Sequence, residues 1–219
     1  MVYGVKILTE IYVVRHCESM GNLLHSFAGH SDVDISPKGE LQLKCLAEYF
    51  KDIKLDKVYT SPLLRAKKTA EAINKYSGAP IIIEPDFIEI NLGVLDGRPV
   101  SEMTDEQTGC WLTEPDKFYV EGGETMREVA DRVSSALKRV ASENPNSKIA
   151  IASHGCAIRN LMRVIKGFAP IGIKEVDWCD NTGINYIVYE NDEFYLEYEN
   201  YTEHLSSDAL AEPVSAWVK

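Results

Sequence analysis

The chain has 219 residues, of which 45% are hydrophobic and 26% are charged, as in an ordinary globular protein. This composition excludes disordered and fibrous proteins, and the length fits one domain with at most a small appendage. The formal net charge of −11 would repel nucleic-acid backbones and anionic membranes, so we expect neither as a partner. An anionic ligand would have to be held by a local basic pocket.

The cysteines and the N-terminal segment indicate the compartment. The 5 cysteines are an odd number without a C-x-x-C pair, so neither a disulfide framework nor a zinc knuckle is expected. The first residues lack the apolar core of a signal peptide. No apolar run approaches the roughly 20 residues that span a bilayer. We therefore expect a protein of the reducing cytoplasm.

Short β-branched runs alternate with helix signals in the first part of the chain. Residues 11–14 predict a buried strand, and the Ser-Pro pair at 36–37 predicts a helix start. Residues 57–60 predict a second strand. A second Ser-Pro pair then begins the helix expected over 61–76.

The alternation continues beyond an irregular segment. Residues 80–84 predict a third strand, whereas glycines and prolines interrupt 85–121, which we call the lid segment. A capping box predicts a helix over 126–142. Residues 148–153 predict a fourth buried strand, followed by a helix over 156–166. This order predicts an α/β fold with a mostly parallel sheet.

The C-terminal part differs in pattern. Residues 174–198 predict antiparallel strands joined by a turn at 191–192. Residues 200–219 are expected to form a surface tail. Because no repeat or linker divides the chain, we expect a single domain over residues 1–219. The sequence leaves open whether an edge strand near Tyr195 pairs two chains in a homo-oligomer.

Polar side chains follow three of the expected buried strands. Arg15 and His16 end the first strand, and Ser61 and Arg65 follow the second. His154 follows the fourth. Because ligand sites in open parallel sheets lie at the carboxyl ends of strands, these groups are expected to converge. Two arginines and two histidines predict an anion site that needs no metal or other cofactor, since guanidinium groups match phosphate oxygens.

Several short motifs occur in order between about residue 11 and residue 160. They are R-H-C-E at 15–18 with Asn22, F-A-G-H-S-D at 27–32, S-P-K-G at 36–39, S-P-L-L-R-A at 61–66 with Thr69-Ala70, Glu89 with Gly93 and Gly97, G-E-T at 123–125, and S-H-G at 153–155 with Arg159. This ordered set resembles the motifs of the histidine phosphatase superfamily, which includes the cofactor-dependent phosphoglycerate mutases. The resemblance implies a phosphoglycerate mutase-like, three-layer α/β/α sandwich.

The resemblance also implies roles for the residues. His16 would be the nucleophile that attacks phosphorus and forms a phosphohistidine. Glu89 would protonate the leaving oxygen and then deprotonate the attacking water. Arg15, Arg65 and His154 would complete the catalytic set. The residues implied to bind the phosphoryl oxygens are Arg15, Asn22, Arg65, His154 and Gly155.

The chain departs from the family pattern at position 17, where glycine is usual and Cys17 stands. Neighbouring arginines would lower the pKa of this thiol and make it sensitive to oxidation. A small buried thiol would instead only pack, and we favour this second interpretation. Cys156 is interpreted in the same way. His30 replaces a usual tryptophan, and we expect His25 and His30 to be exposed.

The same pocket suits hydrolysis or return of the phosphoryl group to another hydroxyl. The stretch 98–121 contains six acids against one arginine and one lysine, which suits a highly anionic phosphoglycerate poorly. Trp111, Phe118 and Tyr119 would pack within the lid segment or form an apolar wall around a leaving group. We therefore favour a metal-independent phosphatase acting on small phosphorylated metabolites. The alternatives are a cofactor-dependent phosphoglycerate mutase and a non-catalytic phosphate-binding protein.

Overall fold

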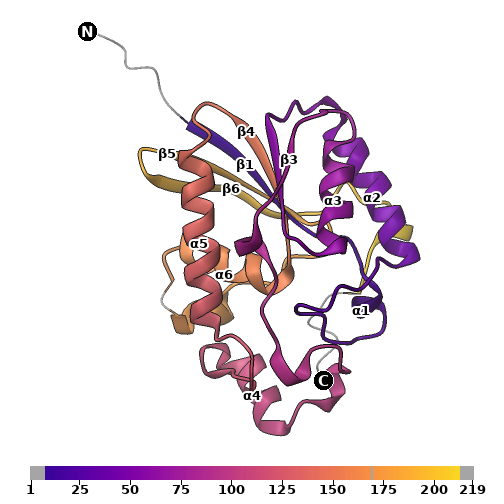
Figure 1. The fold of residues 1–219 in the computed structure, drawn as a ribbon, viewed down its shortest axis with the longest axis vertical. Helices are drawn as coiled ribbons and strands as arrows, with labels where there is room; N and C mark the ends of the chain where they lie inside the picture. The colour runs from indigo at the N-terminus through magenta and orange to yellow at the C-terminus, as the bar shows by residue number, and fades with distance from the viewer. Residues whose placement is uncertain (1–7, 169, 213–219) are drawn as a thin grey trace.

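The computed structural model describes residues 8–168 and 170–212. Its centre is one twisted sheet in the order β3-β2-β4-β1-β5-β6 (Figure 1). The first four strands of this order are parallel to one another, whereas β5 is antiparallel to β1 and β6 is antiparallel to β5, so the mostly parallel prediction is confirmed. The strands are β1 (Leu8–Arg15), β2 (Lys57–Thr60), β3 (Ile81–Ile83), β4 (Lys148–Ser153), β5 (Ile184–Glu190) and β6 (Glu193–Tyr201).

Helices cover both faces of the sheet, which confirms the three-layer prediction (Figure 1). In β1, Ile11 and Val13 face the core beneath α5 and α6, whereas Tyr12 and Val14 face the core beneath α2 and α3. This alternation follows from the two-residue period of a strand. The helices are α1 (Met20–Leu23), α2 (Pro37–Tyr49), α3 (Leu64–Asn74), α4 (Asp105–Thr113), α5 (Met126–Ser142) and α6 (Gly155–Ile165).

Short 3₁₀ helices complete the regular structure. Four of them lie in the lid segment, so the expectation of an irregular segment is only partly right. The segment also contains α4, whose capping box of Thr104 and Gln107 went unrecognised in the sequence. The 3₁₀ helices are Phe50–Asp52, Pro85–Phe87, Gly93–Leu95, Val100–Glu102, Pro115–Lys117, Pro170–Glu175 and Ser207–Ala209.

The start of α3 corrects the sequence prediction. The helix begins at Leu64 and ends at Asn74, and the residue at its N-cap is Leu63 rather than Ser61. The Asp32 carboxylate, from a loop far away in sequence, accepts a hydrogen bond from the Leu64 N–H at 2.6 Å. This distant acceptor replaces the local cap, which frees the Ser61 hydroxyl for another contact.

The third strand also differs from its prediction. β3 spans Ile81–Ile83, and all three side chains are exposed. The cause is its place at the edge of the sheet, where it pairs with β2 alone. The run of isoleucines predicts a buried strand, but composition alone does not distinguish a central strand from an exposed edge strand.

The C-terminal segment confirms one turn and corrects one boundary. Asn191 and Asp192 have positive φ angles and join β5 to β6, as predicted. The strands begin at Ile184 rather than near 174, which lies in a 3₁₀ helix.

The tail expected over 200–219 is partly wrong. Tyr201 ends β6, and Ala209 is fully buried against α2, where its carbonyl accepts a hydrogen bond from Gln42. Residues 213–219 lie outside the described residues.

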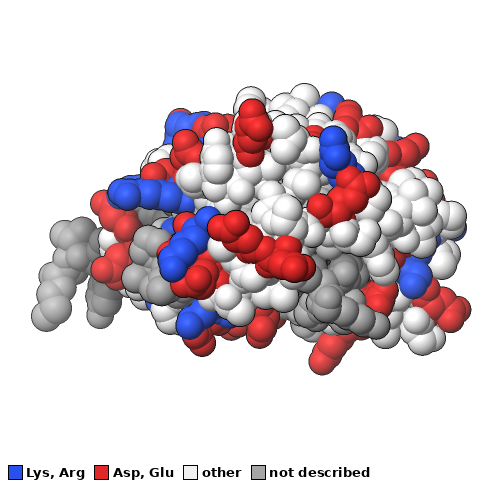
Figure 2. Space-filling view, turned by 90° about the horizontal axis from the view of Figure 1, so that it is seen from below, with Lys and Arg blue, Asp and Glu red and all other residues white. Residues whose placement is uncertain are grey.

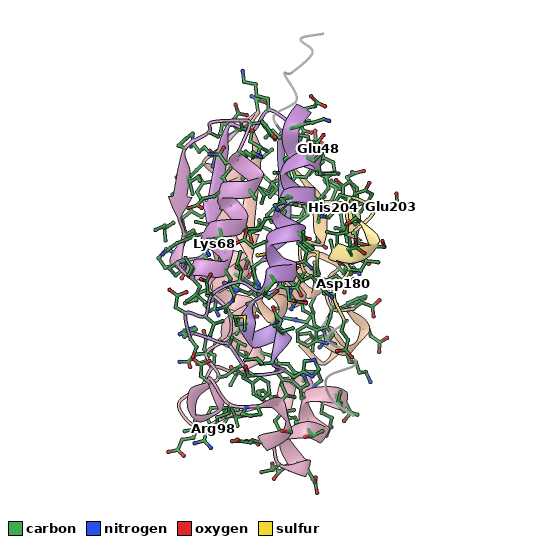
Figure 3. The ribbon with its side chains drawn as sticks, turned by 90° about the vertical axis from the view of Figure 1, so that its right-hand side faces the viewer. Glu48, Lys68, Arg98, Asp180, Glu203 and His204 are labelled. Carbon is green, nitrogen blue, oxygen red and sulfur yellow. The ribbon has the colours of Figure 1, made fainter. Side chains whose placement is uncertain are left out.

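Within the described ranges, no helix is both long and apolar enough to cross a bilayer. In the side view, Arg98 lies in the lid segment at the lower end and His204 lies beside α2 (Figure 3).

Candidate active site

The ends of neighbouring parallel strands bring the predicted residues together. Arg15 is paired with Ser153 across β1 and β4, and the His16 N–H donates to the Ser153 carbonyl at 2.9 Å. The residues that follow, His16 and His154, therefore lie side by side, with ring centroids 5.1 Å apart. The strand order thus places both histidines at one mouth, as the sequence predicts.

His16 is held in the form that a nucleophile needs. Its Nδ1 lies 2.6 Å from the Cys17 carbonyl oxygen. Because a carbonyl only accepts, Nδ1 carries the proton and Nε2 keeps its lone pair. Burial, followed by the charges of Arg65 and Arg15, lowers the pKa of His16 well below 6.5. The ring is therefore neutral at physiological pH.

Arg65 is a buried cation on the first turn of α3, with 1% of its surface exposed. Its terminal nitrogens donate to the carbonyls of Ala28, Gly29 and Ser31, which fixes the guanidinium plane. Its Nε is buried and has no hydrogen-bond partner among the described residues. Burial lowers the pKa of Arg65 to about 10, so the side chain remains charged near neutral pH.

Arg15 is arranged in the same way. One terminal nitrogen donates to the Cys179 carbonyl at 2.6 Å, and its Nε is buried without a partner in the described part of the chain. Gly155, the first residue of α6, lies against this guanidinium. A Cβ at Gly155 would stand 3.4 Å from Arg15 Nε, so glycine keeps this side of the pocket open.

His154 is fully buried between the end of β4 and α6. Its Nε2 lies 2.7 Å from Ser61 Oγ, and its Nδ1 is buried without a partner from residues 8–168 or 170–212. Burial, Arg65 and His16 lower the pKa of His154 well below 6.5. His154 is not among the residues that line the pocket, whereas Arg15 and Arg65 are.

Three buried nitrogens at this mouth therefore have no partner within the described residues: Arg15 Nε, Arg65 Nε and His154 Nδ1. Buried polar atoms in native proteins are nearly always satisfied, so each exception requires an explanation. Both arginine atoms are donors by chemistry. A tetrahedral anion bound beside His16 would supply acceptors, which is the chemistry that the sequence predicts for this place.

Glu89 lies at the start of the lid segment and lines the pocket. Its carboxylate accepts hydrogen bonds from the N–H groups of Cys156 and Ala157 at 3.1 and 3.0 Å, in the first turn of α6. Its carbonyl accepts one from Arg132 at 2.9 Å. These contacts fix Glu89 at the helix N-terminus, where a negative charge is favoured. Its role as the acid stays a prediction.

Asn22 also lines the pocket, from the short helix α1. Its side-chain oxygen accepts hydrogen bonds from the Ser19 N–H and from the Asn181 amide. The Asn181 amide also donates to the His16 carbonyl. Asn22 is thus connected to His16 through Asn181, and its contact with a phosphoryl oxygen stays a prediction.

The cysteines near the site are packing residues. Cys17 is fully buried, and burial raises the pKa of its thiol to about 12, which contradicts the oxidation-sensitive alternative. Burial also raises the pKa of Cys156. The side chains of His25 and His30 are exposed, as expected. Within the described part of the chain, no three His, Cys, Asp or Glu side chains are grouped as ligands of a metal ion.

Aromatic side chains form part of the wall of the pocket. Trp111 of α4 stacks on Trp178, with centroids 5.5 Å apart, and meets the edge of Phe27. The Arg159 guanidinium lies 4.6 Å from the centroid of the Trp178 ring. Of Trp111, Phe118 and Tyr119 in the lid segment, Trp111 alone lines the pocket, and the Phe118 ring packs against it. Trp178 was missed, since it lies in a stretch without periodicity.

Comparisons with known proteins identify the class of this chain. The family model of the histidine phosphatase superfamily (branch 1) matches residues 11–202. The chain belongs to this superfamily, and the sequence prediction of the family and of its enzyme class is confirmed.

Individual relatives carry more specific names. The chain is 34% identical over 201 residues to "Uncharacterized phosphatase PhoE" of Bacillus subtilis, covering 91% of this chain and 98% of that protein. It is 32% identical over 164 residues to "Probable phosphoglycerate mutase GpmB" of Escherichia coli, covering 73% and 76%.

A solved structure, phosphoserine phosphatase of Entamoeba histolytica in complex with 3-phosphoglyceric acid, is 26% identical and has a TM-score of 0.80. The match covers 90% of this chain and all (100%) of that one. It confirms the phosphoglycerate mutase-like fold.

Proposed function

We propose that this protein is a metal-independent phosphomonoesterase that forms a phosphohistidine at His16 and acts on small phosphate monoesters with an apolar leaving group. The observation that carries the proposal is the set of unpartnered buried nitrogens of Arg15, Arg65 and His154 around a neutral histidine. Such a site binds the charge that spreads over phosphoryl oxygens in the transition state.

The reaction would proceed in two displacements. His16 Nε2 attacks phosphorus, the N–P bond forms, and the ester P–O bond breaks. Glu89 gives a proton to the leaving oxygen, so the product departs as a neutral alcohol. Glu89 then takes a proton from water, whose oxygen attacks phosphorus and breaks the N–P bond. Inorganic phosphate leaves, and His16 returns to its neutral form.

The walls of the pocket support an apolar leaving group. Arg15 and Arg65 are the only cations among its described lining residues. Phe27, Trp111 and Trp178 line the pocket together with aliphatic side chains, and a few uncharged polar side chains also line it. A leaving group with its own carboxylate would find no further cation there, whereas a ring or alkyl chain would bury apolar surface.

Charge supports a small molecule rather than a nucleic acid or a membrane as the partner. The net charge of the chain is −11, and acidic and basic side chains are interspersed on the face at the lid end (Figure 2). A small ester can reach the buried arginines without lying against this surface. We extend the proposal to a small metabolite of the cytoplasm as the physiological substrate.

Release of inorganic phosphate in the presence of EDTA tests the proposal. We expect release from phenyl phosphate and p-nitrophenyl phosphate, and weaker release from sugar phosphates and 3-phosphoglycerate. Formation of 2-phosphoglycerate should be followed in the same samples. Isomerisation without release would establish the mutase alternative. Binding of vanadate without turnover of any ester would establish the non-catalytic alternative, and loss of activity in EDTA would overturn metal independence.

A further inference from the structure

Ser61 is a fully buried residue whose hydroxyl the proposed mechanism does not use. It does not cap α3, which begins at Leu64. Its N–H donates to the Ala152 carbonyl at 3.0 Å, which attaches it to β4 two residues before His154. Its Oγ lies 2.7 Å from His154 Nε2. The Ser61 hydroxyl is therefore the hydrogen-bond partner of the His154 ring.

The hydrogen bonds around Ser61 Oγ indicate which atom donates. A hydroxyl has one proton and two lone pairs. The Leu63 N–H donates to Oγ at 3.3 Å and uses one lone pair. Within the described residues, His154 Nε2 is the acceptor in reach of the Ser61 proton. If the ring donated instead, this buried proton would have no acceptor, which is unfavourable.

We propose that Ser61 is a positioning residue that holds His154 in the tautomer protonated at Nδ1, so that the ring donates a hydrogen bond to the phosphoryl group at His16. The inference rests on the proposed function and deepens it. A neutral imidazole carries one N–H, and donation from Ser61 to Nε2 leaves that proton on Nδ1. Nδ1 is the atom of this ring that is buried without a partner.

This tautomer makes the three unpartnered nitrogens alike. Arg15 Nε and Arg65 Nε are N–H donors, and His154 Nδ1 becomes a third. In the other tautomer, Nδ1 would present a lone pair to an anion, and the two would repel each other. Selecting the donor form before the ester arrives removes a reorganisation step from the reaction.

The two histidines then share one tautomer but use it in opposite ways. The Cys17 carbonyl accepts from Nδ1 of His16 and leaves its Nε2 lone pair free to attack phosphorus. The Ser61 hydroxyl donates to Nε2 of His154 and leaves its Nδ1–H free. One acceptor from the next residue and one donor from a distant segment therefore distinguish a nucleophile from an electrostatic stabiliser.

The tautomer can be measured directly. Long-range nitrogen–proton correlation spectra of the full-length protein with isotope-labelled histidine, near neutral pH, should show His154 protonated at Nδ1. His154→Gln assigns the signal. In Ser61→Ala the preference for Nδ1 should be lost, because nothing then donates to Nε2. A wild-type ring protonated at Nε2, or a Ser61→Ala ring still held at Nδ1, would overturn the proposal.

Kinetics supply the second measurement. In Ser61→Ala, kcat for p-nitrophenyl phosphate should fall about 10- to 100-fold with a smaller change in KM, as expected when one transition-state donor is mispositioned. Thr60→Val is the matched control, since it removes a neighbouring buried hydroxyl that donates to the Ser61 carbonyl. It should keep the tautomer and kcat within about 2-fold. Equal losses in both variants would reduce Ser61 to a packing role.

These readouts separate the inference from the proposed function. If the wild-type protein hydrolyses no ester, the proposed function fails, but the spectra still decide the tautomer. If hydrolysis is normal and His154 is protonated at Nε2, the proposed function stands and the role of Ser61 fails.

Discussion

The mouth of the sheet and the lid segment meet at one pocket but are built differently. At the mouth, Arg15, His16, Arg65 and His154 are each at most 4% exposed and are held by backbone carbonyls or a buried hydroxyl. In the lid segment, α4 has no buried residue, and Trp111 packs it against the pocket. We infer that the mouth determines the chemistry and the lid segment determines which ester is accepted.

The largest effect is expected at the mouth. His16→Ala should lower turnover of every ester by about 10⁴-fold or more, as for other enzymes that lose a nucleophile. Steady-state phosphate release measures the loss, and circular dichroism verifies the fold. Turnover within about 10-fold of the wild type would refute the covalent route, since loss of a nucleophile is far costlier.

Glu89 lies where the two regions join, so the loss of kcat on its substitution should depend on the leaving group of the ester. Glu89→Gln should cost about 100-fold or more with an alkyl phosphate, whose leaving oxygen needs a proton, and less than about 10-fold with p-nitrophenyl phosphate. The measurement is kcat for both esters. Equal losses for the two leaving groups would remove the acid role and leave Glu89 as a cap of α6.

In the lid segment we expect a change of selectivity rather than of chemistry. Trp111→Ala should lower kcat/KM for phenyl phosphate about 10-fold, because an apolar pocket contact is worth about 10- to 200-fold. Leu112→Ala is the matched control, since this neighbour on α4 is 49% exposed and does not line the pocket. A uniform loss across all esters in Trp111→Ala would show that the lid segment positions the mouth.

The smallest effect concerns stability at a histidine outside both regions. His204 lies beside α2 among tyrosines (Figure 3), and burial lowers its pKa from 6.5 to about 4. Between these values the unfolded chain binds a proton that the folded chain does not, so the free energy of unfolding falls as pH falls. His204→Phe should flatten this dependence in urea titrations and leave activity unchanged.

The histidines of the mouth provide the comparison. His16 and His154 also have lowered pKa values, so their share of the same pH dependence should persist in His204→Phe. If His204→Phe shows the wild-type dependence between pH 6.5 and 4, His204 is protonated in the folded chain and the burial argument fails.

The two regions also differ in how far the sequence predicted them. The sequence predicts that Arg15, His16, Arg65 and His154 converge, because each lies at or shortly after the carboxyl end of a strand, and parallel strands bring these ends to one edge. The sequence predicts an irregular lid segment, because glycines and prolines are typical of loops, whereas the structure contains α4 there. The sequence did not predict Trp178 as a pocket residue, because it lies in a stretch without helical or strand periodicity.

The sequence by itself determined the layers, the alternation of strands and helices, and the residues with the chemistry of phosphoryl transfer. These depend on local periodicity and on short motifs, which act over a few residues. The tertiary structure decided the contacts between distant segments. Asp32 accepts a hydrogen bond from the N-terminus of α3, the Ser61 hydroxyl contacts His154, and β3 lies exposed at the edge of the sheet. Such contacts depend on which distant segments pack together, and a local sequence pattern does not determine this.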